Sequence, residues 1–268
     1  MNNAVKVFKQ LQASLTQTAV SGLVAAALVI AVVPAVKAAE LSKSDIEQIV
    51  HDYVIKHPDV VMKAADDYQR TAVEERRKAA LKLNRADLFD DNSPFIGNPR
   101  GDVTVVEFFD YNCHYCKQVF PALKSLAESD KNVKIIFKDF PILSPTSELA
   151  AKWALAAQKQ GKYSALHEEL MKHEGPLNEA DIEAAGAAVK LDLAQAKKDV
   201  ESPDAASQIE RNRTLAAQMS FNSTPSFVIN DQAFAGVPQG RDLQQLVTDA
   251  RQQQTDEQGK NKADTTSP

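Results

Sequence analysis

The stretch Val103-Thr104-Val105-Val106-Glu107-Phe108-Phe109 is followed, three residues later, by Cys113-His114-Tyr115-Cys116, which holds the only two cysteines of the 268-residue chain. The first part is apolar and rich in β-branched residues, so it predicts a buried strand. Residues 117–123 then begin to read as a helix. A C-x-x-C pair where a strand passes into a helix places one thiol at the helix N-terminus. Free backbone N–H groups and the helix dipole favour a thiolate there, which is the geometry of thiol–disulfide exchange.

The cysteine pair predicts chemistry and not a structural staple, because Cys113 and Cys116 close a loop too small to restrain the unfolded chain. A zinc site needs four ligands, and the sequence offers no second C-x-x-C and no H-x3–5-H. We therefore expect no metal and no cofactor. A chaperone-like or copper-handling protein whose thiols hold a metal is the alternative from another class. The lack of a third soft ligand near the pair argues against it.

The first 38 residues predict a cleaved secretory signal peptide, with an uncleaved membrane anchor as the alternative. Lys6 and Lys9 form a positive start, residues 20–33 form an apolar core too short to span a bilayer, and residues 36–38 fit a cleavage site. Removal of this segment takes away three lysines and changes the formal net charge from −5 to −8. The acidic remainder has no Lys/Arg cluster that would bind nucleic acid. Export of this kind predicts a periplasmic location.

Residues 39–90 predict a helical region. Ser44–Glu47 has the pattern of a capping box at the start of an amphipathic helix, and His57-Pro58 ends that helix. A second helix runs from Pro58 towards Leu83. It is long and thinly apolar and so needs a partner, which predicts an oligomerisation arm, most simply of a homodimer. A helix folded back on its own domain and a solvated spacer are the alternatives.

Residues 91–254 predict an α/β domain, separated from the helical region by a turn-rich stretch. The order of elements describes a thioredoxin fold with a helical domain inserted in its middle, at about residues 145–221, with Trp153 in the core of the insertion. Residues 255–268 are polar, lack an apolar period and predict a disordered tail. The other predicted elements are strand 103–109, helix 116–128, strand 133–137, strands 224–229 and 232–235, and helix 242–251.

The segment Phe108–Cys116, the helical insertion and Ser223–Phe227 together resemble the DsbA family of periplasmic thiol:disulfide oxidoreductases. The likeness covers nearly all of the chain after the signal. It is greatest to the subgroup that carries an N-terminal helical oligomerisation region, which includes the ScsC-like proteins. The resemblance implies exported proteins with thiols or disulfides as substrates. It also implies a membrane redox partner of the DsbB or the DsbD type.

The residues of the motif take roles from chemistry and from this resemblance. Cys113 is the predicted nucleophile, and the more buried Cys116 resolves the mixed disulfide. His114 can stabilise the Cys113 thiolate, or it can face solvent with little influence. The His114-Tyr115 pair departs from the Pro-His of DsbA itself, and Tyr115, a predicted substrate contact, resembles the isomerase DsbC. The direction of electron flow therefore stays open between an oxidase and an isomerase or reductase.

Three further residues complete the predicted site. Glu107 is an acid inside an apolar strand, and the family places a buried acid at this position beneath the resolving cysteine, where it can accept a proton. Lys138 is either its charge partner or a surface lysine. Pro225 matches the cis-proline of the family, which faces the cysteine pair so that the backbone of Thr224 can pair with an extended substrate. Thr224 again matches the isomerases.

Overall fold

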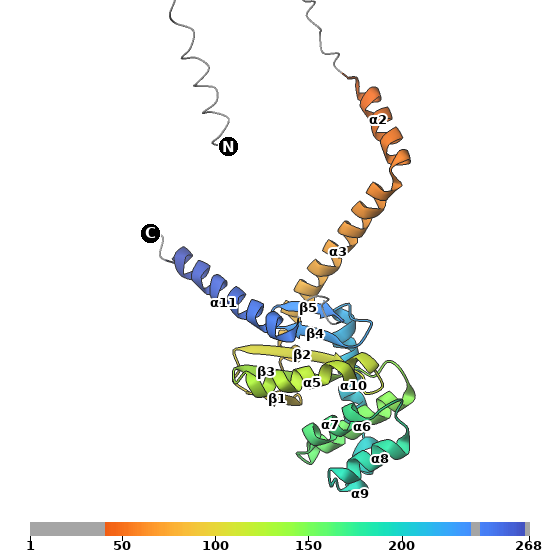
Figure 1. Ribbon diagram of the computed structural model, residues 1–268, viewed down its shortest axis with the longest axis vertical. Coiled ribbons are helices and arrows are strands. Elements are labelled where there is room, and N and C mark those ends of the chain that lie inside the picture. The colour runs from red at the N-terminus through yellow and green to blue at the C-terminus, as the bar shows by residue number, and fades with distance from the viewer. Residues whose placement is uncertain (1–40, 237–241, 266–268) are drawn as a thin grey trace, which may run out of the picture. The chain divides into compact units, whose positions relative to one another are not determined.

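The computed structural model describes residues 41–236 and 242–265. Its centre is a five-stranded sheet in the order β1-β3-β2-β4-β5 (Figure 1). β2 and β3 are parallel, and the other neighbouring pairs are antiparallel. This α/β arrangement, with helices inserted between β3 and β4, confirms the predicted thioredoxin-like fold. The strands are β1 (Phe95–Gly97), β2 (Val103–Phe109), β3 (Val133–Asp139), β4 (Ser226–Ile229) and β5 (Gln232–Ala235).

The inserted helices α6 to α9 gather beyond the sheet, on the side away from β5 (Figure 1). Trp153 of α6 is buried in the core of this insertion, as predicted. The helices are α2 (Lys43–Lys56), α3 (Pro58–Leu83), α4 (Arg85–Leu88), α5 (His114–Ser129), α6 (Pro145–Lys159), α7 (Tyr163–Lys172), α8 (Glu179–Ala188), α9 (Leu193–Val200), α10 (Pro203–Gln218) and α11 (Leu243–Thr265).

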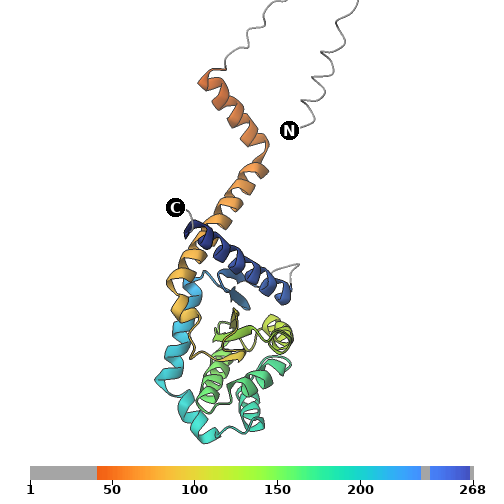
Figure 2. The ribbon, with the colours of Figure 1, turned by 90° about the vertical axis from the view of Figure 1, so that its left-hand side faces the viewer.

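Strand β2 is buried on both faces, because helices cover both sides of the sheet (Figure 2). Side chains alternate along a strand. Val105 and Phe109 therefore join one apolar core with α5, α11 and the insertion. Val106 and Phe108 join a second core with α3, α4 and α10. The same alternation places Glu107 on the α5 side, which is the side of the cysteine pair.

The described chain divides into two compact units at residues 57 and 58. In the first unit, α2 begins with a capping box in which Ser42 and Asp45 each accept a hydrogen bond from the other's backbone N–H. The prediction of this box at Ser44–Glu47 was therefore wrong by two residues. The Asp45 carboxylate is the group that reaches back, and it accepts the N–H of Ser42 at 3.0 Å.

Helix α3 has the predicted bounds, and its C-terminal end belongs to the core of the second unit. Ala80 and Leu81 are buried against the sheet. The Arg77 guanidinium donates to the carbonyls of Met219 and Ser220 at the end of α10. The apolar side chains nearer its start are exposed: Val60, Val61, Met62 and Tyr68.

Two elements differ from the sequence predictions. β1 lies in the stretch predicted as turns and pairs with β3, Phe95 opposite Ile136. It is only three residues long, so it is too short for an apolar period to be visible. α11 continues to Thr265, through much of the segment predicted to be disordered. The Gln252 amide donates to Asp256 at 2.9 Å, one of the local helical contacts that need no apolar face.

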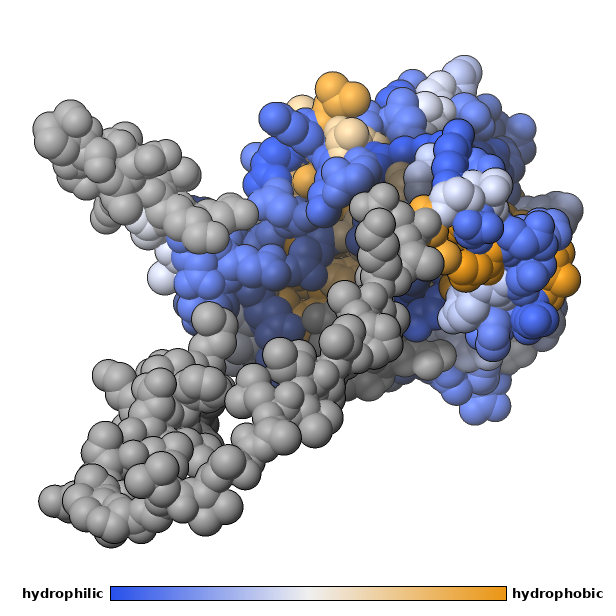
Figure 3. Space-filling view, turned by 90° about the horizontal axis from the view of Figure 1, so that it is seen from above, coloured by the Kyte–Doolittle hydropathy of each residue, from blue (hydrophilic) through white to orange (hydrophobic). Residues whose placement is uncertain are grey.

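No helix within residues 41–236 and 242–265 is long and apolar enough to cross a membrane. The coloured surface in Figure 3 is mostly hydrophilic, with separate hydrophobic patches. The predicted signal peptide, residues 1–38, lies outside the described residues.

Candidate active site

The cysteine pair sits where β2 passes into α5. Cys113 is the N-cap residue of α5, and its N–H donates to the Asp110 carbonyl at 3.0 Å. Cys116 lies one turn into the helix and is completely buried, whereas the side chain of Cys113 keeps 5 % of its surface exposed. Both cysteines are free thiols in this structure. Both cysteines are buried, and Cys116 is the more buried of the two, as predicted.

The two thiols differ sharply in acidity. Hydrogen bonding to Cys116 is the largest cause that lowers the pKa of Cys113 to about 6, and Thr224 and backbone N–H groups at the helix start add to it. Burial raises the pKa of Cys116 far above the ordinary value, and its interactions with Cys113 and Glu107 raise it further. At neutral pH the pair therefore consists of one thiolate and one thiol.

The Thr224–Pro225 peptide bond is cis, which confirms the sequence prediction. The loop that carries it leads into β4 and faces the cysteine pair, with the Cys113 sulfur 3.2 Å from the Thr224 carbonyl oxygen. The Thr224 hydroxyl is buried and has no hydrogen-bond partner of good geometry among the described residues, and its hydrogen-bonding capacity lowers the pKa of Cys113. This loop is therefore the wall of the site that faces Cys113.

Glu107 is fully buried, as predicted, and neither of its carboxylate oxygens has a hydrogen-bond partner among the described residues. Burial raises the pKa of Glu107 well above its ordinary value, and the charge of Cys113 raises it further. The charges of Glu107 and Cys113 in turn help to raise the pKa of Cys116. Glu107 is thus electrostatically coupled to both cysteines.

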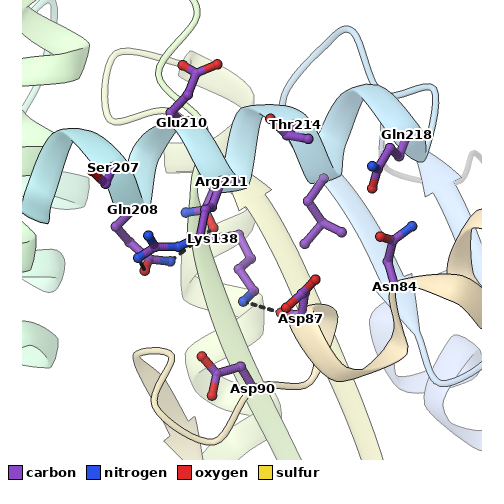
Figure 4. A pocket seen from close by; sticks show the side chains of 12 residues that line it. Asn84, Asp87, Asp90, Lys138, Ser207, Gln208, Glu210, Arg211, Thr214 and Gln218 are labelled. Carbon is purple, nitrogen blue, oxygen red and sulfur yellow. Dashed lines mark hydrogen bonds between the residues drawn. The ribbon is translucent and has the colours of Figure 1, made fainter.

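Lys138 is neither the charge partner of Glu107 nor a surface lysine, so both predictions for it were wrong. Lys138 pairs in register with Phe108, and so it points to the opposite face of the sheet from Glu107. Its ammonium is buried and donates to the Asp87 carbonyl at 2.7 Å and to the Ser93 hydroxyl at 2.8 Å. Figure 4 shows it at the floor of a pocket of about 500 Å³ between α4, α10 and β3.

His114 and Tyr115 form the first turn of α5 with exposed side chains, 67 % of Tyr115 being accessible. Their rings meet edge to face at 5.8 Å. The principal causes of the low pKa of Cys113 are its hydrogen-bond donors, none of which is the His114 ring. The catalytic role of His114 and the substrate contact by Tyr115 stay predictions.

The sequence reading missed the loop residues that hold the site together. The Asp110 carboxylate accepts the N–H groups of Asn112, Ile142 and Leu143 at 2.8, 2.9 and 3.0 Å. This fixes the β3–α6 loop beside the active site and leaves the side chain of Leu143 55 % exposed. The Asp-x-Asn sequence directly after a strand is typical of such side chain-to-backbone turns, and it is the signal that could have revealed them.

Within the described ranges, no group of three or more His, Cys, Asp and Glu side chains is placed to hold a metal ion. A thiolate at a helix N-terminus, a buried thiol one turn later and a cis-proline wall define a thiol–disulfide exchange site. The fold and the site thus define the class of thioredoxin-fold thiol:disulfide oxidoreductases.

Comparison with known proteins narrows this class. A thioredoxin family model matches residues 90–249, more than half of the chain. The chain therefore belongs to the thioredoxin family, as a thiol:disulfide oxidoreductase of the DsbA/ScsC type.

Three solved structures illustrate the likeness. A thioredoxin-like oxidoreductase from Silicibacter pomeroyi is 44 % identical, with a TM-score of 0.60, over 63 % of this chain and 98 % of the other. A linker-deleted, mutant ScsC from Proteus mirabilis is 26 % identical, with a TM-score of 0.63, over 82 % and 98 %. The thiol-disulfide exchange protein alpha-DsbA2 from Wolbachia pipientis is 28 % identical, with a TM-score of 0.61, over 68 % and 97 %.

Among curated proteins, the chain is 30 % identical over 164 residues to the Na(+)/H(+) antiporter NhaA 1 of Salinispora arenicola. The match covers 60 % of this chain and 25 % of the antiporter. The chain thus spans about a quarter of that relative's length.

Proposed function

We propose that this protein is a periplasmic oxidase that donates the Cys113–Cys116 disulfide to newly exported proteins and is reoxidised by a membrane partner of the DsbB type. The observation that carries the proposal is the thiolate at the start of α5, with the pKa of Cys113 lowered to about 6. A stabilised thiolate favours the dithiol form, and a disulfide whose reduced form is stabilised is a stronger oxidant.

The proposed reaction has two steps. A substrate thiolate attacks the Cys113 sulfur of the enzyme disulfide, which breaks the Cys113–Cys116 bond and forms a mixed disulfide. A second substrate thiolate then attacks the substrate sulfur of that bond, so the substrate leaves with a disulfide and Cys113 leaves as the thiolate. Two electrons pass from substrate to enzyme. Cys116 takes up one proton from Glu107, and one of the two protons that the substrate thiols release restores the Glu107 carboxyl. The other goes to solvent, because Cys113 leaves as the thiolate.

The coupling of Glu107 to Cys113 supports this proton path. In the dithiol form the Cys113 charge helps to raise the pKa of Glu107, so the carboxyl holds its proton. Formation of a mixed disulfide removes that charge and lowers the proton affinity of Glu107. Glu107 can then pass its proton to Cys116 in oxidation of substrate, or accept one from Cys116 in the reverse direction.

Trapping the redox state of the two cysteines in cells by thiol alkylation tests the direction. An oxidase is mostly disulfide-bonded at steady state, and a Cys116→Ala variant accumulates mixed disulfides with exported proteins. A mostly reduced pair would overturn the oxidase and favour an isomerase or reductase that a DsbD-type partner keeps reduced. Thr224, which matches the isomerases, is the observation that favours this second candidate.

The exposed apolar side chains of α2 support oligomerisation through the N-terminal helices, most simply as a homodimer. α2 buries none of its residues, and Ile46, Ile49, Val50 and Tyr53 are spaced to form one stripe. Deletion of residues 41–57 should give a folded protein that is monomeric by light scattering and still reduces insulin. A variant that stays oligomeric would contradict the proposal. Deletion as far as Asp90 is unsuitable, because Leu81 belongs to the core.

A further inference from the structure

A cluster of buried ionisable side chains lies on the α5 side of the sheet, behind the cysteine pair. Its members come from β2 and the loop after it, from the end of β3, and from α7. Each is 5 % exposed or less. Burial raises the pKa of each acid and tyrosine and lowers the pKa of the histidine to about 3, so burial favours the uncharged form of every member. The members are Glu107, Tyr111, Asp139, Tyr163 and His167.

Asp139 is the second acid of the cluster, and the proposed exchange reaction does not use it. It is the last residue of β3 and pairs in register with Phe109, so it shares a face of the sheet with Glu107. It lies at the same strand ends from which the active-site loop leaves. The Asn212 amide donates to its backbone carbonyl at 3.0 Å, which holds the residue in place without touching the carboxyl group.

The carboxyl group of Asp139 has no ion-pair partner among the described residues, and hydrogen bonding from its own backbone and from the Tyr163 hydroxyl lowers its pKa less than burial raises it. Neither of its oxygens has a hydrogen-bond partner of good geometry. Burial of an unpaired carboxylate is costly, so a residue with a purely structural role would be amide or apolar here. The charge of the adjacent Lys138 lowers the pKa of Asp139 but is outweighed by burial, and that ammonium is bound to Asp87 and Ser93 on the other face.

Two buried tyrosine hydroxyls are influenced by both Asp139 and Glu107. The pKa of Tyr111 is raised by the charges of both acids, in addition to burial, and so is that of Tyr163. Both carboxyl groups therefore lie within electrostatic range of the same two hydroxyls. The Tyr111 hydroxyl is in turn 2.9 Å from Nδ1 of His167. The charged or titratable groups that influence Asp139 or share its buried cluster are Tyr163 and His167 of α7 and Asp110, Tyr111 and Glu107 of β2 and its loop, while Lys138 lies beside it on the other face of the sheet.

We propose that Asp139 is a positioning acid of the redox site, whose protonated carboxyl group, together with Tyr111 and Tyr163, sets the proton affinity of Glu107. The inference rests on the proposed proton exchange between Glu107 and Cys116. Asp139 takes no electrons and forms no bond. While it is protonated it adds no negative charge behind the cysteines. When it ionises, as burial delays until about pH 8, the new charge opposes the ionisation of Glu107 and of the thiols.

The test is an infrared difference spectrum between the disulfide and dithiol forms of the full chain, in the region of the protonated carboxyl stretch. We expect two bands, one removed by Glu107→Gln and the other by Asp139→Asn. Tyr163→Phe should shift the second band without removing it. The Tyr163→Phe variant keeps the proposal testable if Asp139→Asn does not fold. The control is Asp130→Asn, the same change at the far end of α5, where the carboxylate pairs with Arg251; it should leave both bands intact.

The second readout is the pH dependence of Cys113 alkylation. The native protein should show an inflection near pH 8 in addition to that of Cys113 itself, and Asp139→Asn should lose it while Asp130→Asn keeps it. A band of Asp139 that is identical in both redox states, with an unchanged pH profile, would overturn the proposal. Loss of insulin reduction by the native protein would instead count against the exchange function itself, so the two failures are distinguishable.

Discussion

The acidity of Cys113 predicts how the stability of the reduced protein depends on pH. The pKa of Cys113 falls from its ordinary value of 9.0 to about 6 in the fold. A group whose pKa is lowered by folding contributes stability that is fully present above the ordinary value and is lost as the pH falls to the folded value. Each pKa unit corresponds to about 1.4 kcal/mol, so Cys113 contributes ~4 kcal/mol at pH 9 and almost nothing at pH 6.

The assay is urea unfolding of the dithiol protein across this window, compared at each pH with Cys113→Ser. The comparison is needed because Asp139, whose pKa is raised to about 8, contributes with the opposite sign and is present in both proteins. The difference in unfolding free energy should grow by about 1.4 kcal/mol per pH unit above pH 6. A constant difference would refute the reasoning. At pH 7, one unit above the pKa of Cys113, ionisation of the thiol stabilises the dithiol form about tenfold. This makes the disulfide more oxidising by about 30 mV.

Three further predictions concern the fold that holds the site. Gly101→Ala would place a Cβ 2.7 Å from a backbone carbonyl oxygen within residues 132–134, so it should destabilise the protein by at least ~1 kcal/mol in urea unfolding. Leu123→Ala removes a fully buried side chain of α5 and should cost about 2–5 kcal/mol, measured the same way. Arg251→Gln removes the bidentate contacts to Asp102 that hold α11 and should increase hydrogen exchange in α11 while insulin reduction is retained.

The sequence predicted those parts of the molecule in which local pattern and burial agree. β2 has the predicted bounds because a continuous apolar run is what a strand covered on both faces requires. Glu107 was identifiable because an acid is unusual in such a run. Lys138 was misplaced because the face to which it points depends on the register between β2 and β3, and one residue of register reverses that face.

Other parts of the site could not be predicted from the local sequence pattern. Asp139 stands beside a lysine at the end of a strand, where an acid normally faces water, but in the fold it is buried, with the Tyr163 hydroxyl of α7 close to its carboxyl group. The same holds for His167, because the sequence shows only a polar residue on a helix and does not reveal its contact with Tyr111. β1 is held by pairing with β3 and not by its own pattern. Long-range contacts decide all three cases.

The arrangement explains why a neutral interior lies behind a charged sulfur. The Cys113 thiolate is stabilised chiefly by hydrogen bonds at the helix start and at the Thr224 loop. Behind it, burial raises the pKa of Glu107 well above its ordinary value and that of Asp139 to about 8, which favours the protonated forms of both acids. In such surroundings the appearance or removal of one negative charge on Cys113 is the largest local electrostatic change, and it is felt by Glu107 because little else screens it. A pair of fixed, ionised carboxylates in the same place would oppose the thiolate in every redox state. Two neutral acids allow the thiolate to form and can still exchange a proton when its charge is consumed.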